Sequence, residues 1–555
     1  MKSFSMLCLL FWLLQSSCFL CVVCDARQKF QQRNCGGEIR HVHLAVGKDP
    51  STDMTVSFAT HSSASMSMIR GAVVVGTDPM RLNKVFPEED IASFYHQTQP
   101  RKMGNYSSPY YHHVSVTGLQ PNTTYYYKCI VRQSLADFDK LQKILDVDMS
   151  KRDSEVVADV VEEQMREDTK EVKSGSGQRQ RRRRRTQQRV VGMGHRFLAP
   201  PAYDSTQCAC PDPHKIRSFT TAPAVGTGEN VKFAIIGDIG QFPHSEETMQ
   251  HLRENHNGVQ AIMLAGDLAY PGTDQRKWDS FMDFLDDYPL VEEIPMQITP
   301  GNHDIEKHEH GKEIFQGYEH RFRMPRAHKA NLGLYEGPDG MLNMDRPPYP
   351  LPYEFGNAYY AFKYGPAHWI VLSSYSAIET GSKQYEWFVR ELERVDRNVT
   401  PWLLVMFHTP LYNTFSVHQK DTQILKGREF IEPLLVEYKA NLVFNGHIHA
   451  YQRTTNVAFG NVTDTGPMHI VMGAGGRAAA APFLNEEPED WVVVRDATIY
   501  GYGLLVLCNK THARWDWVHT GTESDHNVVW KHNNVSLPVG GVDHTFVENQ
   551  YFLHV

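Results

Sequence analysis

The spacing of apolar and polar residues changes twice along the chain. Between about His41 and Gln133, short runs alternate apolar with polar residues, as in Met54–Ala59, or are uniformly apolar, as in Ala72–Val75. A turn-rich stretch, Gly118–Thr124, then leads into an aromatic run. Several short strands at regular spacing predict an all-β sandwich, which we interpret as a scaffold domain.

The segment 134–200 interrupts this pattern. Its first part is acidic, and Phe138, Leu141 and Leu145 have helical spacing. A run of arginines, Arg181–Arg185, follows further along the segment. Because blocks of like charge are usually solvated or disordered, we predict a charged, disordered surface insertion. A processing-protease site or a polyanion-binding patch at the arginine run is an open alternative.

From Val231 onward, strand and helix patterns alternate. Strands are predicted at 231–236, 258–264 and 294–299, and the helices between them at 244–255 and 274–288. This order predicts a parallel sheet that is covered on both faces. Further strands are expected at 368–374, 401–407, 440–445 and 469–472, and an antiparallel pair at 503–508 and 512–519.

Residues with metal-ligand chemistry follow five of these strands. The motifs are Gly237-Asp238, Gly266-Asp267-Leu268-Ala269-Tyr270, Gly301-Asn302-His303-Asp304, Phe407-His408 and Gly446-His447-Ile448-His449. Ligands of open α/β sheets gather beyond the carboxyl ends of strands, so we expect these side chains to converge. Carboxylate and phenolate oxygens suit a hard trivalent ion, whereas imidazole and amide groups suit a divalent ion. Together the five motifs predict a binuclear metal site.

This set of motifs resembles the calcineurin-like metallophosphoesterases, and Tyr270 narrows the resemblance to the purple acid phosphatases. The stretch from Gly118 to Tyr125 resembles the start of a fibronectin type III strand. The resemblance covers nearly all of the mature chain except the insertion. It implies a mixed α/β catalytic domain at 231–555, a four-layer metallophosphoesterase sandwich, preceded by an all-β fibronectin type III-like sandwich at 36–222.

The resemblance also implies which residues hold the ions. By that likeness, Fe(III) would be bound by Asp238, Asp267, Tyr270 and His449. A divalent ion, which is Zn, Mn or Fe, would be bound by Asn302, His408 and His447, with Asp267 bridging both. Every ligand position of the family pattern is present. The family owes its colour to charge transfer from a tyrosinate to iron, a role that falls here to Tyr270.

The implied reaction is hydrolysis of phosphate monoesters by a metal-bound hydroxide, with a histidine protonating the leaving group. His303, next to Asn302, is the first candidate for that proton donor. His418 lies ten residues after His408, where the family places a substrate-facing histidine; a plain surface loop is the alternative. Asp304 is expected to orient a ligand from behind.

Other functions of the same residues stay open. A phosphodiesterase, or a phosphatase specialised for phytate or nucleotides, would use the same ligand set. A non-catalytic binding ectodomain is disfavoured because no ligand is missing. The Gly473–Gly476 loop lacks the lysine of a phosphate-binding loop and is expected to form a tight turn. Tyr451 and Arg453 either line the rim of the site or belong to the core.

The beginning of the chain predicts export. Lys2 and the apolar run Met6–Leu14 form a signal peptide, assigned to residues 1–26, although an uncleaved anchor remains open. Six N-glycosylation triplets follow, at Asn105, Asn122, Asn398, Asn461, Asn509 and Asn534. We therefore expect a secreted or vacuolar glycoprotein that contacts no membrane after cleavage.

Charge and cysteine content narrow the set of partners. The formal net charge is -8, so we expect small phosphate esters rather than nucleic acid as substrates. Five cysteines follow the signal peptide: Cys35, Cys129, Cys208, Cys210 and Cys508. One or two disulfides are expected in an oxidising compartment. The odd number leaves a disulfide-linked homodimer open.

Overall fold

The computed structural model of the protein describes residues 39–60, 70–98, 104–132, 134–151, 215–306, 313–325, 346–354, 356–477, 480–522, 529–531 and 543–553. The signal peptide, the arginine run, the triplet at Asn534 and three cysteines (Cys35, Cys208 and Cys210) lie outside these ranges. Within the described ranges, no helix combines the length and apolar character needed to cross a bilayer.

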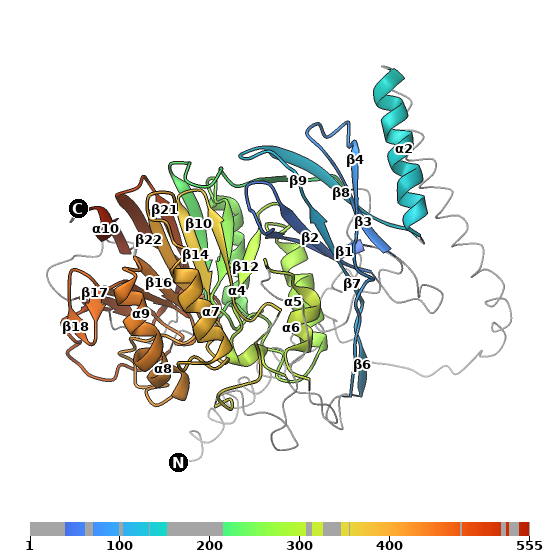
Figure 1. Ribbon diagram of the computed structural model, residues 1–555. Coiled ribbons are helices and arrows are strands. Elements are labelled where there is room, and N and C mark those ends of the chain that lie inside the picture. The colour runs from blue at the N-terminus through green and yellow to red at the C-terminus, as the bar shows by residue number, and fades with distance from the viewer. Residues whose placement is uncertain are drawn as a thin grey trace, which may run out of the picture.

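The first domain is a sandwich of two antiparallel sheets, one ordered β1-β2-β7 and the other β4-β3-β8-β9 (Figure 1). In β8, Tyr125, Tyr127 and Cys129 face the core, alternating with more exposed residues. This period of two is the alternation expected of a half-buried strand. The strands are β1 Ile39–Val46, β2 Met54–Thr60, β3 Arg70–Gly76, β4 Lys84–Pro87, β7 Tyr110–Val116, β8 Thr124–Arg132 and β9 Arg217–Thr220, and a separate ribbon consists of β5 His96–Thr98 and β6 Asn105–Ser107.

The start of the predicted insertion is ordered. Residues Leu135–Lys151 form helix α2, which stands beside the sandwich in Figure 1. Phe138 and Leu145 are buried against Ala72 and Ile130 of the sandwich. The expectation of disorder across 134–200 is therefore wrong for this part, because the helical spacing of its apolar residues outweighs its acidic composition. The remainder, 152–200, lies outside the described residues.

The second domain contains two mixed sheets packed face to face. One is ordered β12-β11-β10-β21-β22-β24, and the other β13-β14-β15-β16-β19-β17-β20-β23 with β18 beside β17. Parallel pairs join β10 to β11, β11 to β12, and β14 through β16 to β19. The strands are β10 Val231–Ile236, β11 Ala261–Leu264, β12 Met296–Ile298, β13 Tyr360–Tyr364, β14 Ala367–Val371, β15 Trp402–Met406, β16 Leu442–Asn445, β17 Tyr451–Ala458, β18 Asn461–Val462, β19 Met468–Met472, β20 Val492–Asp496, β21 Ile499–Leu507, β22 His512–Thr522, β23 Val529–Lys531 and β24 Asp543–Glu548.

Aromatic side chains fill the space between these sheets, where Trp369 packs against Phe233 and Phe444, and Phe444 against Trp515. Helices cover the outer faces (Figure 1), which completes the predicted four layers and confirms the fold class. The helices are α4 Pro243–Asn255, α5 Arg276–Asp287, α6 Gln316–Arg321, α7 Lys383–Leu392, α8 Thr422–Lys426, α9 Glu432–Glu437 and α10 Gln550–Leu553, with a 3₁₀ turn at Asn302–Asp304 and a π-helical turn at Gly427–Ile431.

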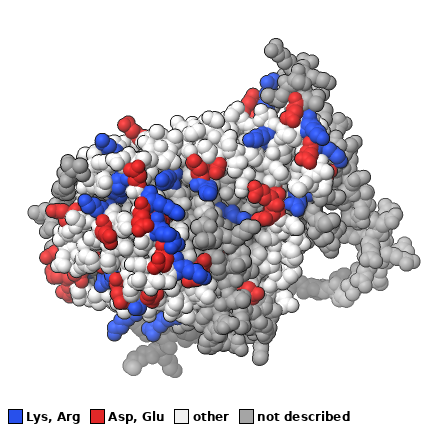
Figure 2. Space-filling view, in the orientation of Figure 1, with Lys and Arg blue, Asp and Glu red and all other residues white. Residues whose placement is uncertain are grey.

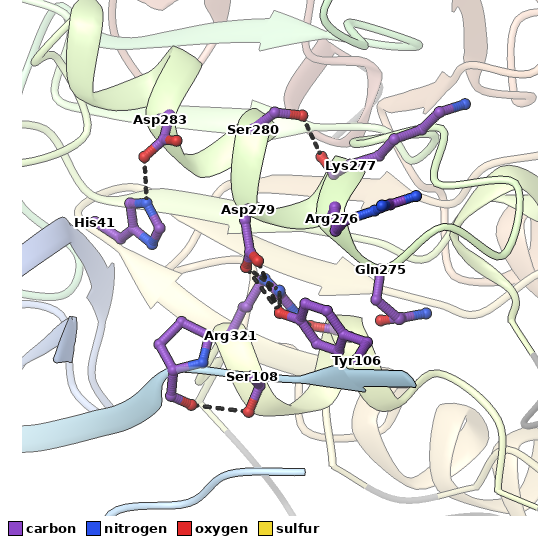
Figure 3. A network of polar contacts seen from close by, with 12 residues as sticks. His41, Tyr106, Ser108, Gln275, Arg276, Lys277, Asp279, Ser280, Asp283 and Arg321 are labelled. Atoms are coloured by element: carbon purple, nitrogen blue, oxygen red, sulfur yellow. Dashed lines mark hydrogen bonds and ion pairs between the residues drawn. The ribbon is translucent and has the colours of Figure 1, made fainter. Parts of the chain in front are cut away.

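The two domains meet at a buried polar network, the seam, drawn in Figure 3. Arg321 at the end of α6 donates hydrogen bonds to two tyrosines of the first domain: Tyr95 Oη, just before β5, at 2.8 Å, and Tyr106 Oη in β6 at 2.9 Å. It also donates to Asp279 Oδ1 of α5, at 2.6 Å. A further contact joins His41 Nε2 to Asp283 Oδ1 at 2.8 Å. The seam fixes α5 and α6 against the sandwich.

Charged side chains at the surface are mixed in sign. On the face shown in Figure 2, acidic and basic residues of the described part are interspersed over the second domain. Several form exposed pairs on helices, such as Arg394 with Glu391 and Lys426 with Glu429. Pairs of this kind contribute about 0–1 kcal/mol each, so they serve solubility more than stability.

Glu306 connects the 3₁₀ turn Asn302–Asp304 to the seam and gives the fold a pH dependence. Its Oε1 accepts the Gly317 N–H of α6 at 2.5 Å, while Oε2 is buried without a hydrogen bond in the described structure. Burial raises the pKa of Glu306 to about 7. The folded protein therefore keeps this proton up to near pH 7, whereas the unfolded chain releases it near pH 4.5.

We expect Glu306 to lower the free energy of unfolding by about 3 kcal/mol as the pH rises from 4.5 to 7. In Glu306→Gln this decline should be smaller, because glutamine carries no titrating proton. Urea denaturation at pH 5 and pH 7 measures the difference. Glu437→Gln removes an exposed carboxylate and serves as the control. Equal pH slopes in wild type and Glu306→Gln would contradict the prediction.

Candidate metal centre

Four of the predicted ligand residues have left-handed backbone conformation. The φ angles are 54° at Asp238, 55° at Asp267, 50° at Tyr270 and 69° at His447. Non-glycine residues rarely adopt this conformation, which costs about 1–3 kcal/mol per residue. Residues keep this conformation where the surrounding structure fixes the backbone, and such residues are enriched at functional sites. Here this conformation occurs in the loops that follow strands β10, β11 and β16.

The glycines in the motifs let these loops touch one another. A Cβ at Gly266 would clash with the His408 ring, and one at Gly301 would clash with the Asp267 carboxylate. A Cβ at Gly446 would clash with the carboxylate of Asp238. These three motifs therefore need their glycines because a neighbouring ligand side chain occupies the space that a Cβ would fill.

The first group of ligands is rich in oxygen. Tyr270 Oη lies 3.2 Å from Asp238 Oδ1 and 3.3 Å from His449 Nε2. His449 Nε2 is 3.4 Å from the same Asp238 oxygen. One donor atom from each of Asp238, Asp267 and His449 lies within 4.8 Å of the others. Two carboxylates, a phenol and one imidazole thus surround a single small volume.

The second group is centred on an amide oxygen. Asn302 Oδ1 lies 3.0 Å from His408 Nε2 and 2.9 Å from His447 Nδ1. The groups are joined by Asp267, whose Oδ1 is 3.5 Å from His408 Nε2, and by the His447 N–H, which donates to Asp238 Oδ2 at 2.8 Å. The structure therefore brings all seven predicted ligand residues together, with Asp267 between the two groups.

The chemistry of these donors fits two cations. His408 Nδ1 is hydrogen-bonded to the Ala265 carbonyl at 2.7 Å, which leaves Nε2 as the ligand atom. Burial raises the pKa values of Tyr270 and Asp238, so their charged forms need a nearby cation. The oxygen-rich group suits a hard ion, and the amide and imidazole group suits a borderline one.

The donor side chains also shift one another's pKa values. Burial would lower the pKa of His408, but the neighbouring Asp267 carboxylate raises it to about 9. Burial works against ionised Asp267, yet His408 holds the pKa of Asp267 well below its usual range. Burial lowers the pKa of His447 to about 3, which keeps this ring neutral, as a metal ligand must be.

Both predicted catalytic histidines lie beside the ligand groups. The His303 ring stacks on Tyr270 with centroids 4.6 Å apart, and the backbone N–H of His303 donates to Asp267 Oδ1 at 2.8 Å. The His418 ring centroid is 4.1 Å from that of His447. His418 is partly exposed at 26% and has a left-handed φ of 58°.

Asp304 connects the loops from behind the ligands. Its Oδ2 accepts the Gly301 N–H at 3.0 Å, and its Oδ1 accepts the Leu268 N–H at 2.9 Å. One carboxylate thus ties the segment that carries Asn302 to the segment that carries Asp267. This geometry supports the orienting role that we expected for Asp304.

The structure decides the alternatives for two other motifs. Arg453 is buried and forms a two-pronged ion pair with Asp543 at 2.6 and 2.8 Å, and Tyr451 Oη donates to the same carboxylate at 2.6 Å. Both residues belong to the core, so the rim alternative is wrong. The loop Gly473–Gly476 packs on the loop of Asp238, with the Gly475 N–H donating to Gly237 O at 3.0 Å.

Sequence reasoning missed three residues at the site. Asp421 Oδ2 lies 2.8 Å from His418 Nδ1 and 3.1 Å from His447 Nε2, and Tyr375 Oη donates to Asn302 Oδ1 at 3.1 Å. Arg477 lies over the Tyr270 ring. The sequence could have indicated Tyr375, because this residue follows the end of β14 just as the candidate ligands follow the ends of other strands.

Three family models match the chain in order along the sequence. The N-terminal domain of purple acid phosphatase matches residues 39–139, and calcineurin-like phosphoesterase matches residues 231–451. Iron/zinc purple acid phosphatase-like protein C matches residues 466–529. The second of these models contains all seven predicted ligand residues.

Curated relatives of the chain include several plant proteins. Purple acid phosphatase of Glycine max is 32% identical over 343 residues, 58% of this chain and 68% of the relative. Probable purple acid phosphatase 20 of Arabidopsis thaliana is 32% identical, covering 56% of this chain and 66% of the relative. Purple acid phosphatase 15 of Arabidopsis thaliana is 24% identical, covering 89% and 85%. The chain spans less than two thirds of several of these relatives: 66% of purple acid phosphatase 20, 59% of purple acid phosphatase 18 of Arabidopsis thaliana and 61% of purple acid phosphatase 1 of Ipomoea batatas.

A solved structure has the same fold. Purple acid phosphatase PPD1 from yellow lupin (Lupinus luteus) seeds superimposes with a TM-score of 0.60 at 17% identity, covering 89% of this chain and 74% of that chain. Three findings indicate the same family: the order of the three matched models, the relative that aligns over 68% of its length, and the shared fold. The chain belongs to the purple acid phosphatase family.

Proposed function

We propose that the protein is a secreted acid phosphatase that hydrolyses phosphate monoesters at an Fe(III)–M(II) centre, where M is Zn, Mn or Fe. The observation that carries the proposal is the meeting of seven donor side chains in two linked groups. One group is rich in oxygen and the other in nitrogen, which is the division that a trivalent and a divalent ion require.

The ligand assignment follows these groups. Asp238, Asp267, Tyr270 and His449 hold the iron, while Asn302, His408 and His447 hold the divalent ion together with Asp267. When bound, the two ions neutralise the phosphate charge and lower the pKa of water. The chain itself fixes the donors through the strained loops and through the hydrogen bonds that Asp304 makes.

The two histidines handle protons and phosphate oxygens. His303 is held by its stacking on Tyr270 and by its backbone bond to Asp267, so its ring can donate a proton to the leaving alkoxide. His418 Nδ1 is hydrogen-bonded to Asp421, which leaves Nε2 to bond a phosphate oxygen.

Export and glycosylation form part of the proposal. Five of the six triplet asparagines lie in the described residues, and all five are exposed: Asn105, Asn122, Asn398, Asn461 and Asn509. Cys129 and Cys508 are free thiols. Burial raises the pKa of Cys129 to about 12, which makes it unreactive. The expected disulfides therefore depend on Cys35, Cys208 and Cys210, and the homodimer remains a prediction.

The test is purification of the full chain from an oxidising host. We expect two metal ions per chain, a visible absorption band and hydrolysis of p-nitrophenyl phosphate at acid pH. Faster turnover of bis-p-nitrophenyl phosphate would favour the phosphodiesterase instead. Metal-free protein without turnover of either compound would leave only the binding ectodomain.

Tyr270→Phe is expected to remove the visible band, because the phenolate oxygen that donates charge to iron is gone. Absorption spectroscopy of the iron-loaded protein measures this. Tyr375→Phe is a matched control: Tyr375 is also buried and lies beside Asn302, but it is not an assigned ligand. A band that survives in Tyr270→Phe and disappears in Tyr375→Phe would reverse the assignment.

A further inference from the structure

The loop Gly473–Arg477 holds one arginine beside the site in a fixed place. The Arg477 N–H donates to the carbonyl oxygen of Asp238 at 3.1 Å. Gly476 has no room for a side chain, because a Cβ there would clash with the Ile239 carbonyl and the Ser245 hydroxyl. The backbone that carries Arg477 is therefore pinned to the loop that carries a candidate iron ligand.

The side chain of Arg477 lies over two aromatic rings. Its guanidinium carbon is 5.1 Å from the centroid of Phe242 and 5.8 Å from that of Tyr270. The two rings pack edge to face, with centroids 5.3 Å apart. Cation–π contacts of this kind orient a guanidinium without using its N–H donors. The exposed Arg477 thus keeps its donors available at the mouth of the site.

The charge of Arg477 faces Tyr270, where it acts against the burial that raises the pKa of that phenol. In the described part of the chain no carboxylate pairs with its side chain, whereas Arg321 and Arg453 each have an aspartate partner. A cation next to a site that holds two further cations raises the electrostatic free energy of that site. An anionic ligand that contacts both the ions and Arg477 would reverse the sign of this interaction.

We propose that Arg477 and the Phe242 ring form a second anion subsite, which gives the enzyme a preference for substrates with another anionic group next to the scissile phosphate, such as nucleoside diphosphates, whose terminal phosphoanhydride bond is hydrolysed to a nucleoside monophosphate and phosphate. This inference rests on the proposed function, because the scissile phosphate occupies the metal centre. The guanidinium offers a planar pair of N–H donors that matches two phosphate oxygens.

The test compares ADP with AMP, which share the nucleoside and differ in the second phosphate. In Arg477→Gln the KM for ADP is expected to rise about 3–10-fold, as for loss of a charge-assisted hydrogen bond near the surface. The KM for AMP should rise less, because AMP loses only the long-range electrostatic attraction of the Arg477 charge. Arg477→Lys should fall between wild type and Arg477→Gln, because it keeps the charge but not the planar fork.

Two further measurements separate the subsite from other causes. Arg81→Gln removes the same charge from an exposed position between β3 and β4 and should leave the ADP-to-AMP ratio of KM values unchanged. Calorimetry measures how tightly the metal-loaded protein binds the non-hydrolysable α,β-methylene-ADP. In Arg477→Gln this binding should weaken by a similar factor.

Equal KM changes for ADP and AMP, or unchanged analogue binding, would overturn the inference. A wild type that hydrolyses p-nitrophenyl phosphate but neither nucleotide would also overturn it. A wild type that hydrolyses none of the three compounds would instead contradict the proposed function, and analogue binding would still decide the role of Arg477.

Discussion

Asp267→Asn is expected to lower kcat/KM for p-nitrophenyl phosphate by at least about 10³-fold, which corresponds to about 4 kcal/mol of transition-state stabilisation. Asp267 is the side chain that lies between the two ligand groups, so its loss weakens both proposed ion sites at once. The amide keeps the shape of the carboxylate but removes the charge that a shared ligand supplies. Metal analysis of the purified variant should show fewer than two ions per chain.

Two controls give this result its meaning. Asp464→Asn removes a carboxylate from an exposed turn and should leave activity unchanged. Asp304→Asn should cost about 10–100-fold, because Asp304 holds the ligand loops without belonging to the ligand set. Asp267→Asn with two bound ions and near wild-type turnover would refute the bridging role.

Arg321→Ala is expected to lower the free energy of unfolding by about 3–5 kcal/mol. Arg321 is fully buried, and its removal deprives the Asp279 carboxylate of its cation and two tyrosine hydroxyls of a donor. Since those tyrosines belong to the first domain, the loss should also loosen the contact between domains. Urea denaturation, followed by tryptophan fluorescence, measures the change.

The exposed pair of Arg276 with Asp274, at 2.8 Å, is the matched control. Arg276→Ala should change stability by less than about 1 kcal/mol, because water solvates both partners. The double variant Arg321→Ala/Asp279→Ala should lose less than the sum of the two single changes, since neither charge is then left buried alone. Additive single changes would show that Arg321 acts through packing rather than through the ion pair.

The strands and the convergence of the seven candidate ligand residues were predictable from sequence for one reason. The strand predicted at 231–236 coincides with β10, and the ligands follow it and the later strands at the positions that the strand-end rule indicates. Buried strands are apolar and short, so a polar residue directly after one is conspicuous. The same logic would have identified Tyr375.

The features that sequence could not provide depend on contacts between distant segments. Arg321 and Tyr106 are 215 positions apart, and nothing local indicates that they meet. Asp421 gains its role only because His447, in the loop after β16, lies beside it. In α2, local charge suggested disorder, while two buried side chains, Phe138 and Leu145, fix the helix. The composition of a segment indicates only how well it is solvated on average. Whether a helix such as α2 forms depends on a few specific contacts.

The left-handed residues at the ligand loops bear on how the protein matures. Four of them together cost an amount of the same order as the net stability of a typical domain, about 5–15 kcal/mol. Ions captured by the folded loops, and not by the unfolded chain, offset this strain by mass action. Under the proposed function, metal loading would be a folding step as well as an activation step. The yield of native protein would then be tied to the supply of metal in the compartment where the chain folds.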